Sequence, residues 1–218
     1  MTELIDFVLH IDVYLLDVVK TYGAWIYGVL FLVVFAETGL VVTPILPGDS
    51  LLFAAGALAA TGAMDVRLVL VLLVIAAIAG DAVNYSVGRS VGTRVIRLAE
   101  VDPRWRRWIN PAHIRKAHEF FERHGGKAIV LGRFMPIVRT FVPFVAGAAD
   151  MSYSSFAFYN VAGAIAWVGI CVGAGYIFGN VPIVKENFTL VALGIVVVSL
   201  LPMLIEYLRH RKAAGSLP

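Results

Sequence analysis

The chain has 218 residues, of which 60% are hydrophobic and 15% are charged, and its mean hydropathy is +0.84. A soluble domain carries about 25% charged residues, so this composition excludes an ordinary soluble protein. Runs of apolar residues long enough to cross a bilayer recur, and we predict an all-α polytopic membrane protein. The net charge of +3 does not indicate nucleic-acid binding, because the basic residues cluster beside apolar segments, as the positive-inside rule predicts.

Residues 1–22 predict an amphipathic helix at the membrane surface. Apolar residues such as Leu4 and Val8 recur at helical spacing with acidic residues between them. A packed helix that caps a bundle explains the pattern equally well. The stretch lacks a positive n-region and a small-residue cleavage site, so it is a poor signal peptide. We expect one membrane domain over 23–207 and a basic tail over 208–218.

Residues 37–60 resemble a membrane segment interrupted by residues that lipid excludes. Glu37 and Asp49 are the only charges between Lys20 and Asp65. A proline inside a helix costs about 3 kcal/mol, and a charge at the bilayer centre about 2.5–3.5 kcal/mol. Such features persist only where they face protein or a water-filled cavity. We therefore predict a re-entrant hairpin that is broken by three residues, Pro44, Pro47 and Gly48.

A complete span is predicted over 66–88, and a basic connection over 89–127 follows it with ten Lys/Arg against four Asp/Glu. The positive-inside rule places this connection in the cytoplasm. Within it, Asn110-Pro111 predicts the start of a helix that stops at Gly125-Gly126. Its basic residues either contact anionic lipid or only determine topology. Its histidines do not share one helical face, so we expect no metal and no other cofactor.

Residues 128–149 repeat the pattern of the first hairpin with the opposite charge. This apolar segment contains Arg133 and Arg139, and its helix-breaking residues are Pro136 and Pro143. We predict a second re-entrant hairpin, followed by spans over 153–179 and 186–207. Trp167, in the first of these spans, is expected to pack inside the bundle.

The order of segments predicts an inverted repeat. A hairpin followed by a single span crosses the membrane an odd number of times, so the second copy is inverted and the two hairpins oppose each other. Glu37 and Asp49 would then meet Arg133 and Arg139 across a shared cavity. The alternative is a set of purely structural buried ion pairs, Glu37–Arg139 or Asp49–Arg133. Asp81 is a further carboxylate within the span 66–88, expected to face the cavity or to make a structural hydrogen bond.

Several motifs together resemble the DedA family, also called the SNARE-associated or VTT-domain family. ETGLVVTPILPGD at 37–49 resembles its first signature, and GRFMPIVRT at 132–140, followed by AG at 146–147, resembles its second. The other matches are GDxxNYxxGR at 80–89, MxxxxFxxxNxxGxxxW at 151–167 and GYxxG at 175–179. The resemblance extends over about residues 20 to 205.

This resemblance implies two opposed re-entrant hairpins in a multi-pass protein of the bacterial inner membrane. It also implies a role in envelope integrity, with some members recycling undecaprenyl phosphate and eukaryotic relatives scrambling phospholipids. The family's required acids correspond to Glu37 and Asp49, and its required arginines to Arg133 and Arg139.

Charges and resemblance together predict a translocase for a phosphate-bearing lipid such as undecaprenyl phosphate or a phospholipid. Arg133 and Arg139 would bind the phosphate, while Glu37, Asp49 and Asp81 are candidates for proton coupling. The alternative is a proton- or cation-coupled transporter of a small anion or drug. We expect no enzyme, because no phosphatase histidine motif is present. A homo-oligomer is left open, and the connection and C-terminus are expected in the cytoplasm.

Overall fold

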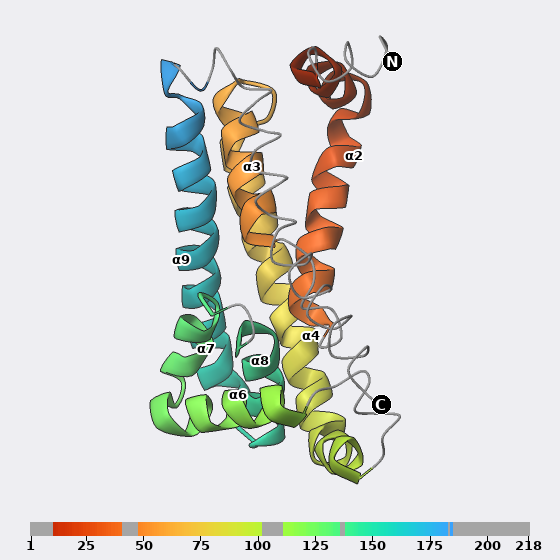
Figure 1. The fold of residues 1–218 in the computed structure, drawn as a ribbon, viewed down its shortest axis with the longest axis vertical. Coiled ribbons are helices and arrows are strands. Elements are labelled where there is room, and N and C mark those ends of the chain that lie inside the picture. The colour runs from red at the N-terminus through yellow and green to blue at the C-terminus, as the bar shows by residue number, and fades with distance from the viewer. Residues whose placement is uncertain (1–10, 41–47, 102–110, 136–137, 183, 185–218) are drawn as a thin grey trace, which may run out of the picture. The chain divides into compact units, whose positions relative to one another are not determined.

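The computed structural model describes residues 11–40, 48–101, 111–135, 138–182 and 184, and throughout these residues the regular secondary structure is helical (Figure 1). The helices are α2 (Ile11–Gly39), α3 (Gly48–Ala60), α4 (Val66–Val101), α6 (Pro111–His124), α7 (Lys127–Gly132), α8 (Val138–Ala148) and α9 (Tyr153–Gly179). The all-α architecture predicted from the composition is confirmed.

The chain divides into two compact units. The first unit contains residues 1–26, 47–69 and 171–218, and the second contains residues 27–46 and 70–170. The division passes through α2, α4 and α9, so these helices contribute to both units, whereas α6, α7 and α8 lie wholly in the second unit.

Within the described residues, two helical stretches are long and apolar enough to cross a bilayer: α9 and the part Val66–Gly92 of α4, each with 27 residues. At 1.5 Å per residue this length is about 40 Å, against a hydrocarbon core of about 30 Å. Only 33% of each apolar window is buried, and exposed side chains such as Ile75 and Ile165 are suited to lipid. The predicted span over 153–179 is confirmed, while the one over 186–207 lies outside the described residues.

The predicted span over 66–88 is too short. α4 continues to Val101, so the first part of the basic connection predicted over 89–127 is helical. The reason is local: the residues after Gly92 include good helix formers, and the next proline is Pro103. The rest of the connection follows the prediction where it is described. α6 begins at Pro111, ends at His124, and is followed by Gly125 with a φ of 55°.

The predicted boundary at residue 22 lies inside α2, which is continuous from Ile11 to Gly39. The stretch that spans this boundary contains no proline, so nothing local stops the helix there. The predicted end of a separate surface helix at residue 22 is therefore wrong. Residues 1–10 lie outside the described part of the chain.

The helix break predicted in the first hairpin separates α2 from α3. α2 ends at Gly39 and α3 begins at Gly48, while Pro44 and Pro47 lie outside the described residues. Glu37 occupies the last turn of α2, and Asp49 the first turn of α3. Gly48 is thus the first residue of a helix rather than a break within one.

The second predicted hairpin is a pair of short helices, α7 and α8, that pack against each other. Gly132, at the end of α7, faces α8: a Cβ atom there would lie 3.2 Å from Val142. Pro136 lies outside the described residues, and Pro143 lies inside α8 without breaking it. The prediction that Pro143 breaks the hairpin is wrong, because nine of the eleven residues of α8 are buried and this packing outweighs one lost helical hydrogen bond.

α8 forms the centre of the second unit. Its buried residues Phe141, Phe144 and Val145 join a hydrophobic cluster with Tyr85 of α4 and Phe156 of α9. The amphipathic helix α6 covers this cluster with its apolar face, which includes Ile114 and Ala117. In Figure 1, α6 runs across the foot of the picture beside α7 and α8.

Glycines allow α4 and α8 to approach until their backbones touch. A Cβ atom at Gly88 would lie 2.0 Å from the carbonyl oxygen of Phe144, and one at Gly147 would lie 2.1 Å from the carbonyl oxygen of Tyr85. On each helix, the glycine contacts a backbone carbonyl of the other helix. That carbonyl belongs to the residue three positions before the other helix's own glycine. This reciprocal contact fixes where α8 crosses α4.

The first unit contains a matching crossing between α3 and α9. A Cβ atom at Gly56 would lie 2.1 Å from the carbonyl oxygen of Val172, and one at Gly175 would lie 2.0 Å from that of Phe53. The spacing of three residues is the same on both helices. The crossing segments also share sequence, FAAGA at 53–57 and FVAGA at 144–148.

A methyl group added at the α4–α8 crossing is expected to destabilise the protein. Gly88→Ala forces a Cβ atom against backbone, so the free energy of unfolding should fall by about 1–3 kcal/mol. The measurement is the thermal unfolding midpoint of the purified protein in detergent. The control is Gly169→Ala in α9, where the added Cβ would meet no described atom within 4 Å outside the neighbouring backbone of its own helix; it should be neutral or stabilising. Equal loss in both variants would contradict this role of the crossing.

Candidate functional site

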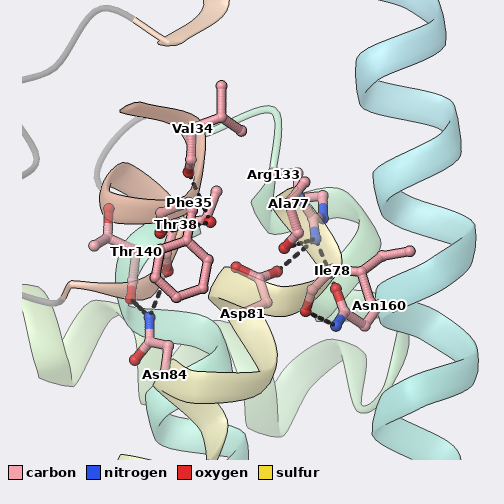
Figure 2. Close-up of polar contacts among 10 residues, drawn as sticks. All are labelled: Val34, Phe35, Thr38, Ala77, Ile78, Asp81, Asn84, Arg133, Thr140 and Asn160. Atoms are coloured by element: carbon pink, nitrogen blue, oxygen red, sulfur yellow. Dashed lines mark hydrogen bonds and ion pairs between the residues drawn. The ribbon is translucent and has the colours of Figure 1, made fainter. Parts of the chain in front are cut away.

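Arg133 is buried in the second unit, and its guanidinium is held by two helices. Nη2 donates hydrogen bonds to Asp81 Oδ2 of α4 at 2.6 Å and to Asn160 Oδ1 of α9 at 2.7 Å (Figure 2). A longer contact, 3.4 Å, joins Nη2 to the carbonyl oxygen of Ala77. The side chains of Arg133 and Asp81 are 5% and 4% exposed, so this is a buried ion pair.

Asn160 is oriented by a second hydrogen bond. Its Nδ2 donates to the carbonyl oxygen of Ile78 at 3.1 Å, so its amide oxygen faces the arginine (Figure 2). The stem of Arg133 lies over Gly163, where a Cβ atom would be 3.2 Å from its Cδ and Nε. Three residues of α9 therefore face the arginines from one side of the helix, at positions i, i+3 and i+7. Asn160 provides a hydrogen-bond acceptor, Gly163 leaves space for the stem of Arg133, and Trp167 provides an aromatic ring.

Arg139 forms the second ion pair of the site. Its Nη2 donates to Glu37 Oε1, and the two side chains are 10% and 6% exposed. Glu37 comes from the last turn of α2 and Arg139 from the start of α8. The Cζ atom of Arg139 also lies 4.8 Å from the ring centre of Trp167, and that of Arg133 lies 5.8 Å from it. Both distances are in the range of cation–π interactions.

The two ion pairs share one small cavity. Seven described residues line it: Glu37, Thr38, Asp81, Arg133, Arg139, Thr140 and Trp167. The space open to the centre of a water-sized sphere is about 10 Å³, which is about enough for one water molecule. The formal charges of its two carboxylates and two guanidiniums cancel. An anionic ligand would therefore compete with the two carboxylates for the guanidinium donors.

Asn84 attaches the end of α2 to α8 beneath this cavity. Its Nδ2 donates to the carbonyl oxygens of Thr38 at 3.1 Å and Thr140 at 2.8 Å (Figure 2). Its side-chain oxygen is buried and has no hydrogen-bond partner in the described part of the chain. Gly80 of α4 accommodates Thr38, because a Cβ atom there would lie 1.9 Å from the threonine Oγ1. α2, α4 and α8 therefore meet next to Glu37 and Arg139.

Four of the residues predicted from the sequence meet at this cavity. Glu37, Arg139, Arg133 and Asp81 line it together, and the pairing Glu37–Arg139 is present. Arg133 pairs with Asp81, a partner that neither predicted ion pair included. Asp49 belongs to the first unit, where its side chain is exposed in the first turn of α3.

Sequence reasoning missed four residues of the site: Thr38 and Thr140, which line the cavity, and Trp167 and Asn160, which contact the arginines. Trp167 was expected only to pack in the bundle, and it does so with an exposed fraction of 2%, but it also faces both guanidiniums. Asn160 was not singled out. The signal was present in the spacing of Asn160, Gly163 and Trp167, which repeats along one face of a helix that had already been predicted correctly.

Across the described ranges, no three His, Cys, Asp or Glu residues gather as a metal site would require. On α6, His118 lies 3.3 Å from Glu122, and both side chains are more than half exposed. The ring of His124 contacts the carbonyl oxygen of Phe120 at 2.9 Å.

Comparisons with known proteins identify relatives along nearly the whole chain. The VTT domain family matches residues 46–177. Protein DedA of Escherichia coli K12 is 54% identical over 97% of this chain and 95% of its own length. The uncharacterized membrane protein Rv0364 of Mycobacterium tuberculosis H37Rv is 38% identical over 90% of this chain and 85% of its own length. The inner membrane protein YqjA of Escherichia coli K12 is 38% identical over 72% of this chain and 70% of its own length. No solved structure matches the chain.

Breaking the Asp81–Arg133 pair from one side should destabilise the protein more than removing both charges. Asp81→Asn or Arg133→Gln leaves a buried charge without its partner, which costs about 3–5 kcal/mol. The double variant should lose less unfolding free energy than the two single variants lose together. A double-mutant cycle of unfolding midpoints measures this difference. Glu119→Gln, on the exposed face of α6, is the control and should be neutral. Additive losses would show that the two side chains do not depend on each other.

Proposed function

The chain belongs to the DedA family of membrane proteins and carries its VTT domain, and from this premise we propose that it translocates a phosphate-bearing lipid across the inner membrane. The proposed substrates are undecaprenyl phosphate and phospholipids. The observation that carries the proposal is the convergence of Arg133 and Arg139 on one buried cavity, each neutralised by a carboxylate.

Arginine suits the recognition of a lipid phosphate inside a membrane. The guanidinium is planar, remains charged when buried, and donates parallel N–H bonds that match two phosphate oxygens. Carboxylates use the same donors. In this structure Glu37 and Asp81 occupy donor positions that a phosphate would require, so each carboxylate acts as a removable substitute for the ligand.

The small size of the cavity favours an exchange mechanism. With room for about one water molecule, it cannot admit a phosphate until an ion pair opens. Proton uptake by Glu37 would remove its negative charge and release Arg139 to the incoming headgroup. Loss of the headgroup would restore the pair. Proton movement and lipid movement would then be coupled through one side chain.

The repeated crossings support the proposed inverted repeat with two opposed re-entrant hairpins. Phe53 and Gly56 contact α9 in the way that Phe144 and Gly147 contact α4. Equal spacings and closely similar sequences on the two hairpin helices are what an internal repeat predicts. Transporters with such repeats bind substrate near the bilayer midplane on interrupted helices, and Glu37, Arg133 and Arg139 all lie at the ends of helices or in a turn.

We further propose that the connection 89–127 and the C-terminus face the cytoplasm, with basic residues at the anionic lipid surface. The inner membrane is the proposed location, as in the name of YqjA. The proposed activity is transport and not catalysis.

Transport of a fluorescent polyprenyl phosphate into proteoliposomes tests the assignment. Arg139→Ala and Glu37→Ala should each lower the initial transport rate at least about tenfold. The first variant loses charge-assisted hydrogen bonds to the lipid phosphate, and the second loses the side chain that couples proton uptake to lipid movement. The control is Arg115→Ala, which removes an exposed arginine of α6 and should transport at the wild-type rate. Wild-type rates in both test variants would show that the assignment is wrong.

The same vesicles separate the competing functions. Strong competition by soluble inorganic phosphate would favour a transporter of small anions. Release of inorganic phosphate from the lipid would indicate a phosphatase. Translocation that neither competes with soluble phosphate nor releases it supports lipid transport.

Lipid binding should depend on pH through Glu37. The ligand is phosphatidylglycerol, a phosphodiester whose charge is constant from mildly acidic to neutral pH. Wild-type affinity should rise as the pH falls, because protonated Glu37 releases Arg139. Glu37→Gln should be independent of pH, at the affinity that the wild type reaches in acid. Asp81→Asn is measured in parallel, since Asp81 faces the same cavity; if it alone abolishes the pH dependence, Asp81 carries the proton.

A further inference from the structure

Two of the contacts of Arg139 differ in how a ligand would affect them. Its Nη2 donates to Glu37 at the edge of the guanidinium plane, while its Cζ lies 4.8 Å from the ring centre of Trp167. An anion competes with the carboxylate for the N–H donors at the edge. It does not compete for the face of the guanidinium, which an aromatic ring can occupy at the same time.

Arg133 is held in a different way. Its Nη2 is shared by Asp81 and Asn160, from two different helices, and its stem is packed over Gly163. Its Cζ lies farther from the ring of Trp167, at 5.8 Å. The two arginines therefore differ: Nη2 of Arg133 is shared by acceptors from α4 and α9, whereas the ring of Trp167 lies closer to Arg139.

We propose that Trp167 is a positioning residue of the anion site, which holds the Arg139 guanidinium in the cavity when Glu37 exchanges for the phosphate of the ligand. This inference rests on the proposed function and assigns to Trp167 a role that the ion pairs alone do not supply. Trp167 is suited to it because it is 2% exposed, lines the cavity, and belongs to the helical face that also carries Asn160 and Gly163.

Without the indole, the guanidinium of a released Arg139 would lose one of the contacts that orient it. An arginine side chain loses considerable rotamer freedom when it is ordered, and this loss would then oppose ligand binding. With the indole, the guanidinium is already in place when the carboxylate leaves. Trp167 should therefore strengthen the recognition of the phosphate, and it should leave the contacts of the hydrocarbon chain unchanged.

The test compares farnesyl phosphate with farnesol, which has the same chain without the phosphate, as ligands of the purified full-length protein in detergent. Trp167→Leu should lower the affinity for farnesyl phosphate about 5- to 10-fold and leave that for farnesol unchanged. Trp167→Phe keeps an aromatic ring, so its affinity for farnesyl phosphate should fall about threefold or less. The control is Trp25→Leu, which removes a tryptophan that is 75% exposed on α2 and should bind like the wild type.

A double-mutant cycle with Arg139→Ala separates positioning from packing. If Trp167 acts through Arg139, Trp167→Leu should not lower the phosphate preference any further in the Arg139→Ala background. An unchanged preference in Trp167→Leu, an equal loss for both ligands, or a full additional loss in the Arg139→Ala background would each overturn the inference.

A wild type that does not prefer the phosphate would refute the proposed function, and the contact itself is then tested without ligand. The chain has four tryptophans, so a variant with Trp25, Trp105 and Trp108 replaced by Phe reports on Trp167 alone. Its emission should change when Arg139→Ala is added. An unchanged emission would overturn the positioning role.

Discussion

The second unit depends on one requirement: a guanidinium buried away from water has to find its acceptors inside the protein. Arg133 finds them on α4 and α9, through Asp81 and Asn160. Removing a charged group from water costs several kcal/mol, which attraction to a counter-charge repays only in good geometry. Satisfying this one side chain therefore connects the turn after α7 to two long helices. The cavity, the position of Arg139 and the contact with Trp167 all depend on that connection.

The sequence predicted the helices and most of the charged residues of the site, because each leaves a local signal. Charges inside apolar stretches identified Glu37, Asp81, Arg133 and Arg139, and an Asn-Pro pair marked the start of α6. The start of α6 at Pro111 and the end of α9 at Gly179 were predicted correctly. The predicted end at residue 88 was wrong, because α4 continues through Gly88 and Gly92 to Val101.

What the sequence did not reveal depends on contacts between distant residues. The pairing of Arg133 with Asp81 is made by packing across 52 positions, and no local pattern encodes it. Pro143 was expected to break its segment, because the cost of a proline in a helix is local while the burial that offsets it is tertiary. Trp167 looked like an ordinary core residue, and its second role depends on two arginines that the sequence places elsewhere.

The placement of the partners of Arg133 along the chain has a consequence for biogenesis. Asp81 precedes Arg133 by 52 residues, whereas Asn160 follows it by 27. A ribosome thus makes the counter-charge first, then the arginine, and the neutral amide last. The most costly group to leave without a partner in the membrane has its counter-ion available from the moment it is synthesised. The amide joins once α9 has emerged, so the completed helix closes around a charge that is already neutralised.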